Sequence, residues 1–551
     1  MAKQSHPKAL YTLFATEMWE RFSYYGMRAL FTLYLTAELM NGGFGLSDDD
    51  SLKLYAVFTG LVYLTPILGG WVADKFLGKR KTVYIGGLVM AVGQFLLAAS
   101  AFLAQSLDPG VRLILFNFGL GVLIIGNGFF KPNISTIVGD FYDDNDPRKD
   151  SAFNIFYMGI NLGAILGPFI AGALGEKVAW GWGFLAAGIG MVLSVIWLNW
   201  RESTLEDKGL PPNTASDKIV LDGKDWRDIF TYSVGLILAT FVVMMIWRQL
   251  PDFVTSIVTI AGFSAIVIGL AYVIIRGIEE GDAWKTPFYS VVGVVVAFLV
   301  VKYGGIWDTL SPDVQKYSLY AIAVLALVGI ITLLRNNNKD WSRMGVILTL
   351  AFFNVAFWAG FEQAGGTFNI FAKKFTNRVF FGWEMPASWF QNINPIAILI
   401  LAPIFSVVWL KLDKMKLNPR TSIKFALGLF FGALAFFIMT RAQHLIDGGA
   451  GKISPLWLFV VYVVLTLGEL MLSPIGLSMI TKLANPKLVS VVMGLWMASF
   501  AAGNFMAGML KSILNEYQFP LYPFIMWVML GAGLIIVLLS PLLNKAMKGI
   551  H

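Results

Sequence analysis

Long apolar segments recur along the whole chain, and this repetition restricts the fold more than any other feature of the sequence. About 20 apolar residues cross the hydrocarbon core of a bilayer as a helix, the one open-ended structure that satisfies its own backbone in lipid. The candidate segments lie at 10–40, 52–73, 82–104, 111–138, 151–174, 180–199, 229–247, 253–275, 287–303, 317–334, 344–372, 388–410, 423–440, 456–481, 489–510 and 521–543. An all-α polytopic membrane protein is therefore expected.

Composition supports this class and excludes others. The 551 residues are 57% hydrophobic and 14% charged, whereas soluble domains contain about 25% charged residues. Cysteine is absent, which excludes disulfides, thiolate chemistry and Cys metal sites. The histidines, His6, His444 and His551, lie outside the centres of the apolar segments. Proton chemistry within the membrane would therefore use carboxylates.

Four charged residues, Glu17, Glu20, Arg21 and Arg28, lie well inside the first apolar segment. One charge at the centre of a membrane helix costs roughly 2.5–3.5 kcal/mol on a translocon scale. Together with Tyr24 these residues follow helical spacing and share one face. That face must be turned into a bundle or a water-filled cavity and away from lipid.

The order of the segments predicts two six-helix halves. We expect an N-terminal bundle at 1–200, a cytoplasmic linker at 201–228, inserted helices at 229–343 and a C-terminal bundle at 344–551. With the N-terminus inside, Lys and Arg are concentrated in the cytoplasmic loops, so both termini are expected in the cytoplasm. The net charge of +8 is then a topology signal and does not point to nucleic acid.

Further charges lie within the later segments. Lys131 follows a long apolar run, Glu362 lies one turn after Trp358, and Glu469 lies near the middle of its segment. All intramembrane bases thus fall in the first half, and the second half contains only acids. A central cavity with one cationic and one anionic wall would suit a zwitterion. Some of these side chains have a structural alternative: Asn161 fits helix packing as well as ligand binding, and for Trp496 the spacing alone favours packing over a pocket wall.

Several motifs resemble a known family. The stretch from Gly70 to Lys81, GWVADKFLGKRK, is similar to the loop signature of the major facilitator superfamily. The first segment reads Glu17-Met-Trp-Glu20-Arg21-Phe-Ser-Tyr-Tyr25, and FYMGINLGA follows at 156–164. With Lys131 and Glu362, these motifs resemble the proton-dependent oligopeptide transporters (POT/PTR), and a bacterial member in particular. The chain departs from the family pattern in two ways. Four apolar segments, or two helix pairs, are counted between the halves where prokaryotic members usually have one pair, so either the insert is unusual or 287–303 is not a span. The second helix also lacks the histidine of animal members.

The resemblance implies a major facilitator fold, with two six-helix bundles and extra helices between them, and proton-coupled uptake of di- and tripeptides by alternating access. Glu362 would pair with Arg28 near the outer gate. The remaining implied residues form two groups. Those implied in proton coupling are Glu17, Glu20, Arg21 and Glu362, and those implied in substrate binding are Tyr25, Arg28, Tyr63, Lys131, Asn161, Trp358, Asn394, Glu469 and Trp496.

The expected partners are a di- or tripeptide, protons and the lipid bilayer, and the chain is expected to function as a monomer in the bacterial inner membrane. No nucleic acid, metal or cofactor is expected, and protons are the coupling ion. The alternative is transport of another anion, such as nitrate, or of a peptide-like drug on the same scaffold. An intramembrane protease lacks support, since paired intramembrane aspartates and HExxH are missing from the sequence. A passive channel remains open until uphill flux is measured.

Overall fold

The computed structural model describes residues 5–143, 146, 148–210, 331, 334, 335, 339–483 and 489–547. Within these ranges the fold is almost entirely helical, and nine helical segments are long and apolar enough to cross a membrane. Helix α1, which contains Glu17, Glu20, Arg21 and Arg28, is not among the nine. The predicted insert at 229–343 lies outside the described residues up to 330.

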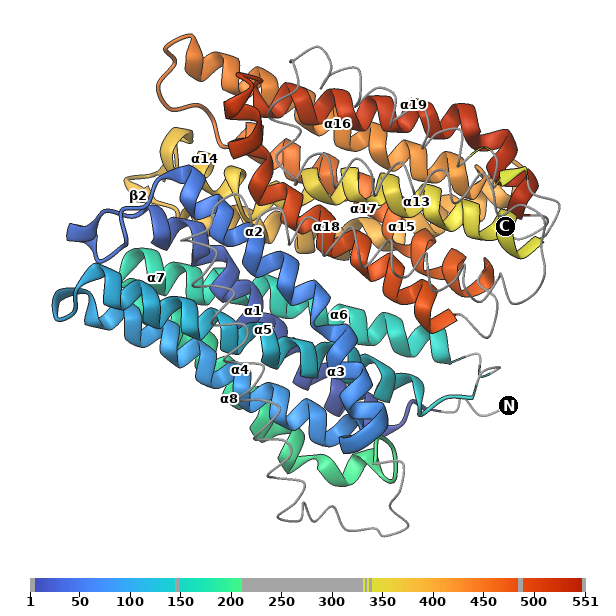
Figure 1. Ribbon diagram of the computed structural model, residues 1–551, viewed down its shortest axis with the longest axis horizontal. Coiled ribbons are helices and arrows are strands. Elements are labelled where there is room, and N and C mark those ends of the chain that lie inside the picture. The colour runs from blue at the N-terminus through green and yellow to red at the C-terminus, as the bar shows by residue number, and fades with distance from the viewer. Residues whose placement is uncertain are drawn as a thin grey trace, which may run out of the picture.

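The N-terminal half contains six helical spans that pack side by side (Figure 1). Two of them are composite: α2 continues into α3 at Thr65, and α6 continues through a π-helical turn, η4, into α7. The elements are α1 (Lys8–Thr36), α2 (Asp48–Leu64), α3 (Pro66–Val72), α4 (Gly78–Phe102), α5 (Pro109–Gly139), α6 (Lys149–Gly167), η4 (Pro168–Gly172), α7 (Ala173–Lys177) and α8 (Trp180–Trp200).

The C-terminal half also has six spans, and its first span is broken near the middle of the bundle. Helix α13 (Lys339–Phe361) passes through a 3-10 turn, η7 (Glu362–Ala364), into α14 (Thr367–Phe375). A short hairpin, β1 (Val379–Phe380) and β2 (Trp383–Glu384), and the 3-10 turn η8 (Ala387–Asn392) then lead into α15. The remaining helices are α15 (Ile393–Lys414), α16 (Thr421–Asp447), α17 (Leu456–Leu483), α18 (Val489–Glu516) and α19 (Leu521–Met547).

Local sequence explains where several helices begin. The Ser47 hydroxyl accepts a hydrogen bond from the Asp50 backbone N–H at 3.1 Å, and three aspartates occupy the first turn of α2. Anionic residues are favourable at this positive end of the helix dipole. In α5, Asp108 caps the helix and Pro109 fills its first position, where no N–H is needed.

Close packing within the first half depends on small residues. A Cβ built on Gly163 of α6 would lie 2.2 Å from the Met18 carbonyl oxygen of α1. One on Gly69 of α3 would lie 1.9 Å from the Gly128 carbonyl oxygen of α5. Both positions therefore require glycine, and α1 is held tightly against α6. This contact fixes the face of α1 that carries the charged residues.

The two halves meet at one end of the bundle, opposite the end at which α1 begins and α19 finishes (Figure 1). We call these the contact end and the terminal end. At the contact end Lys374 Nζ lies 2.7 Å from Asp48 Oδ1, and Lys511 Nζ lies 3.4 Å from Asp49 Oδ1. Among the described residues, the polar contacts between the halves all lie between this end and the centre of the molecule.

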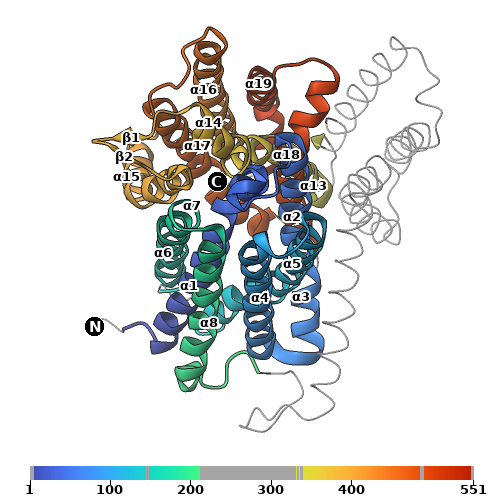
Figure 2. The ribbon, with the colours of Figure 1, turned by 90° about the vertical axis from the view of Figure 1, so that its left-hand side faces the viewer.

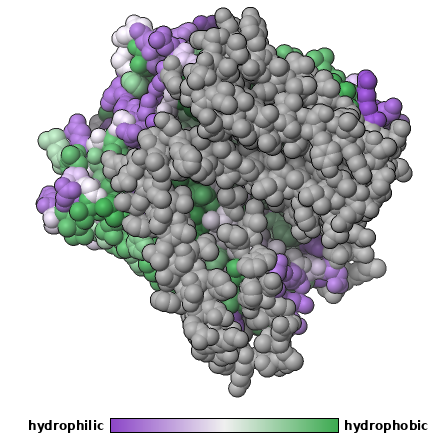
Figure 3. All heavy atoms as spheres, viewed as in Figure 1, coloured by the Kyte–Doolittle hydropathy of each residue, from purple (hydrophilic) through white to green (hydrophobic). Residues whose placement is uncertain are grey.

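Figure 2 looks along the bundle from the contact end and shows the two halves side by side, with α2 and α18 adjacent at their boundary. In Figure 3 the described part of the visible surface has hydrophilic residues at the upper left and at the right, and a hydrophobic patch at the left.

Candidate functional site

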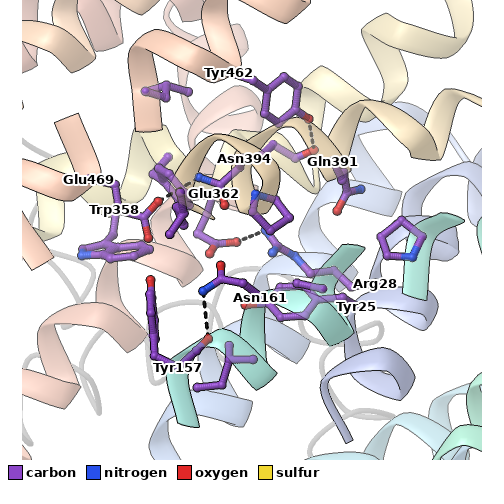
Figure 4. A pocket seen from close by; sticks show the side chains of 18 of the residues that line it. Tyr25, Arg28, Tyr157, Asn161, Trp358, Glu362, Gln391, Asn394, Tyr462 and Glu469 are labelled. Atoms are coloured by element: carbon purple, nitrogen blue, oxygen red, sulfur yellow. Dashed lines mark hydrogen bonds and ion pairs between the residues drawn. The ribbon is translucent and has the colours of Figure 1, made fainter. Parts of the chain in front are cut away.

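A cavity of about 170 Å³ lies between the two halves near the middle of the bundle (Figure 4). Elements α1, α2, α6 and η4 line it from one half, and α13, η7, η8, α15 and α17 line it from the other. Its polar lining residues are Tyr25, Arg28, Tyr63, Tyr157, Asn161, Trp358, Glu362, Gln391, Asn394, Tyr462 and Glu469.

An ion pair between the halves occupies one side of this cavity. The Arg28 guanidinium of α1 pairs with the Glu362 carboxylate of η7, and both side chains are less than a tenth exposed. The buried Tyr55 hydroxyl accepts a hydrogen bond from Arg28 Nε at 2.8 Å and donates one to Glu362 Oε2 at 3.3 Å. The break of the seventh span at η7 places Glu362 here. A buried pair of this kind is costly to break by removing one partner, since the other charge is left alone.

A second carboxylate lines the cavity on α17. Glu469 Oε2 accepts a hydrogen bond from Asn394 Nδ2 at 2.8 Å, and the same amide donates to the Thr466 hydroxyl at 2.9 Å. The Asn394 amide that binds Glu469 is neutral, and no basic side chain among the described residues forms an ion pair with this carboxylate. It is available to a cationic group of a ligand.

Aromatic side chains form much of the remaining wall. Trp358 donates from Nε1 to Asn354 Oδ1 at 3.1 Å, which fixes its ring. Its ring centroid lies 4.7 Å from that of Phe500, which stacks on Tyr63 at 6.4 Å. The Asn161 amide donates to the Tyr157 carbonyl oxygen of its own helix at 2.9 Å, so its own oxygen is left for other donors.

A separate charged network lies on the same helix as Arg28, towards the terminal end. Arg21 Nε lies 2.7 Å from Glu17 Oε1 and 2.6 Å from Glu20 Oε2, and all three residues are buried. Asn127 of α5 donates to Glu20 Oε1 at 3.2 Å. Lys131, one turn further along α5, has its Nζ 3.9 Å from the centroid of the Tyr63 ring. Tyr63 therefore lies between this network and the cavity.

The residues expected from the sequence divide into two groups in space. Those that line the cavity are Tyr25, Arg28, Tyr63, Asn161, Trp358, Glu362, Asn394 and Glu469. Those outside its lining are Glu17, Glu20, Arg21, Lys131 and Trp496. Trp496 is fully buried, and its ring meets Phe500 edge to face at 6.1 Å. Phe500 in turn packs against Trp358 of the cavity wall.

Sequence reasoning passed over four polar residues of the site: Tyr55, Tyr157, Gln391 and Tyr462. Tyr157 lies one turn before Asn161 on the same face of α6, so its spacing was a usable signal. Tyr55 and Tyr462 are single tyrosines in apolar helices and carry no such signal. Among the described residues no three His, Asp or Glu side chains are grouped to hold a metal ion.

Comparison with known proteins places the chain in a family. A protein-family model, described as PTR2 of the POT family, matches residues 80–219 and 290–527. The chain is 34% identical to the peptide transporter YePEPT of Yersinia enterocolitica, over 94% of this chain and 90% of that protein. It is 31% identical to a di-/tripeptide transporter of Lactococcus lactis subsp. cremoris, again over 94% and 90%.

Solved structures agree with these sequence matches. A peptide transporter POT in complex with sulfate is 32% identical and superposes with a TM-score of 0.75, over 100% of this chain and 97% of that one. A POT family transporter in complex with a thioalcohol-conjugated peptide is 28% identical, with a TM-score of 0.69 over 98% and 97%. The fold predicted from the sequence, a major facilitator bundle of two six-helix halves, is confirmed. The chain belongs to the POT family of membrane transporters.

Proposed function

We propose that this chain is a proton-coupled symporter that takes up di- and tripeptides by alternating access. One observation carries the proposal: a single buried cavity between the halves has the Arg28–Glu362 ion pair on one part of its wall and the Glu469 carboxylate on another. An extended zwitterionic peptide has a carboxylate for Arg28 and an ammonium for Glu469. Relatives named as peptide transporters support this substrate class.

The ion pair supplies a way to couple protons to the peptide. Protonation of Glu362 removes its charge and releases Arg28, which then binds the peptide carboxylate. Tyr55 contacts both members of the pair and keeps Arg28 oriented when Glu362 leaves it. In this proposal Glu17, Glu20 and Arg21 hold the second proton-handling network, and Lys131 and Tyr63 link that network to the cavity. Asn161, Asn394, Tyr25, Trp358 and Trp496 shape the peptide pocket.

The proposal also assigns an orientation. With both termini in the cytoplasm, the contact end is the outer gate, which is shut here by Lys374, Lys511 and their aspartate partners. A bacterial inner membrane supplies an inside-negative potential worth roughly 2.3 kcal/mol per proton for each 100 mV. One proton then supports about a fifty-fold peptide gradient before any pH difference contributes.

The test is accumulation of radiolabelled dialanine in proteoliposomes with an imposed inward proton gradient. Glu362→Gln should lose uphill accumulation but retain exchange of dialanine across the membrane, because the neutral amide can no longer cycle a proton. Glu38→Gln, at an exposed glutamate, is the matched control and should behave like the wild type. Accumulation at the wild-type level in Glu362→Gln would overturn the coupling role, and absence of uphill flux in the wild type would overturn symport.

A further inference from the structure

The β1–β2 hairpin between α14 and α15 presents an apolar tip. Val379 pairs with Glu384 and Phe380 with Trp383, which leaves Phe381 and Gly382 as the two turn residues. Both have positive φ angles, 50° and 80°. Such turns favour Asn-Gly or Asp-Gly, because these residues tolerate the left-handed region. Here an aromatic residue occupies the strained position, and its side chain is fully exposed.

The other side chains of the tip continue the apolar surface. Val379, Phe380 and Trp383 are 55%, 43% and 49% exposed. Together with Phe381 they form four apolar residues on a six-residue hairpin, with one charged member, Glu384. We call Val379, Phe380, Phe381 and Trp383 the apolar tip. In water such a tip would be unfavourable, and large exposed apolar surfaces mark sites of interaction.

Hydrogen bonds and an ion pair hold the base of the hairpin in place, so the fold itself keeps the tip exposed. Arg378 is buried, lies 2.7 Å from Glu384 Oε1 through Nη2, and donates to the Met385 carbonyl oxygen. Burial opposes ionisation of Glu384, but its basic neighbours, Arg378 foremost, lower the pKa of this carboxyl below its ordinary value. The backbone N–H of Asn377 donates to the Ile453 carbonyl oxygen at 2.8 Å.

The hairpin lies beside a surface that faces lipid. Helix α15 exposes Ile396, Ile400, Ile404, Val407 and Leu410 at helical spacing, a continuous apolar stripe along one face. Seen along the bundle in Figure 2, the hairpin projects sideways from the C-terminal half next to α15. Since α15 begins at Ile393, soon after the hairpin ends at Glu384, the apolar tip lies near the start of this stripe, at the contact end.

Aromatic and basic residues surround the tip. The Trp383 and Trp389 ring centroids are 5.5 Å apart, and Trp389 stacks on Phe169 of the other half at 4.5 Å. Lys177 Nζ lies 3.6 Å from Glu384 Oε2 and 5.8 Å from the Trp383 ring centroid. Tryptophan beside lysine is typical of the boundary between lipid headgroups and acyl chains.

We infer that the apolar tip is inserted into the lipid bilayer at the headgroup–acyl boundary of the leaflet at the contact end. The hairpin then anchors the connection between the broken seventh span and α15, with its charged base at headgroup level and its aromatic tip among the acyl chains. The occupant of the apolar surface is phospholipid, because the hairpin projects beside α15, whose exposed apolar stripe faces the same medium.

The absence of cysteine from the chain allows a direct test. Phe381→Cys and, as a second position, Val379→Cys are labelled with an environment-sensitive fluorophore in the full chain and reconstituted into liposomes. Ala450→Cys, in the exposed glycine-rich loop that precedes Ile453, is the matched control. Each labelled variant must first elute as a single monodisperse species in detergent.

Phosphatidylcholine brominated on its acyl chains should quench the label at 381 and 379 severalfold more strongly than the label at 450. Iodide, equilibrated across both membrane faces by freeze–thaw, should do the reverse. Iodide quenching at 381 and 379 as strong as at 450 would place the tip in water and overturn the inference. Lipid-dependent disulfide dimers of unlabelled Phe381→Cys, with no quenching by brominated lipid, would instead identify a second copy as the occupant and would also overturn it.

Discussion

At the residue scale, each buried charge of the site has only a few described hydrogen-bond or ion-pair partners. The Arg28–Glu362 pair has the Tyr55 hydroxyl as its third member, and Glu469 is held by Asn394 alone among the described residues. A buried charge that loses one of these contacts has no water to replace it. Single substitutions here should therefore change ligand affinity measurably without removing the fold.

Tyr55→Phe should raise the peptide concentration that gives half-maximal uptake by about tenfold. The lost hydrogen bond to a charged group is worth roughly 1.5–3 kcal/mol, and 1.4 kcal/mol corresponds to a factor of ten. Concentration-dependent dialanine uptake in proteoliposomes measures the effect. Tyr84→Phe is the control, because the Tyr84 hydroxyl has no hydrogen-bond partner within the described residues. Equal values for Tyr55→Phe and the wild type would exclude Tyr55 from orienting Arg28.

Glu469→Ala should raise the half-saturating concentration of dialanine by about tenfold or more, because the peptide ammonium loses its counter-charge. For N-acetyl-dialanine, which has no ammonium, the same substitution should have little effect. Inhibition of labelled dialanine counterflow by each peptide gives the two affinities for each protein. A similar loss for both peptides would show that Glu469 does not contact the amino group.

At the element scale, the contact end is closed where elements of one half contact elements of the other. Helix α2 of the first half contacts α14 and α18 of the second, and the short helix α7 of the first half contacts η8 of the second. The buried Glu176 carboxylate accepts hydrogen bonds from the backbone N–H groups of Ala387 at 3.0 Å and Ser388 at 2.8 Å. A carboxylate at the first turn of η8 acts as a helix cap supplied by the opposite half. Opening of this end must break the cap.

Glu176→Ala should therefore shift the protein towards the form that is open at the contact end. Loss of a cap costs about 1 kcal/mol, which changes a two-state ratio about fivefold. Spin labels on Ser106→Cys and Ala450→Cys, one exposed position in each half, report the separation by pulsed EPR. A larger population at long distance is expected. Lys373→Met removes only the 3.7 Å contact to Glu176 and should change little; an unchanged distribution in Glu176→Ala would contradict the capping role.

At the scale of the whole molecule, the cavity exists only where the two halves meet. A ligand that contacts both α1 and α17 should therefore stabilise the assembled bundle as well as fill the site. Binding to the folded state alone adds about 2.7 kcal/mol at a ligand concentration one hundred times the Kd.

A saturating dipeptide should accordingly raise the Tm of the detergent-solubilised protein, and nitrate at the same concentration should not. Scanning fluorimetry over a series of peptides gives the measurement. The Arg28→Ala, Glu469→Ala double variant, which lacks both proposed charged contacts, should show no shift. Stabilisation by nitrate in place of dipeptide would favour the alternative of a small anion as substrate.

The sequence alone determined the class of the fold and the placement of charge along it. Apolar runs of this length can only be membrane helices, and intramembrane charges such as Arg28, Glu362 and Glu469 must face a cavity because lipid cannot solvate them. Eight of the expected residues do line the cavity, since helical spacing together with the exclusion of charge from lipid fixes the direction of a side chain.

Only the tertiary structure decided which polar groups share contacts. Tyr55 joins Arg28 and Glu362, which are more than 300 positions apart in the chain, and Glu176 caps a turn of the opposite half. A tyrosine in an apolar helix and a glutamate at a helix end are common in sequences, so neither residue type indicates such a contact by itself. Their roles arise from the docking angle between two bundles. That angle is set by summed packing over many residues, and no local pattern encodes it.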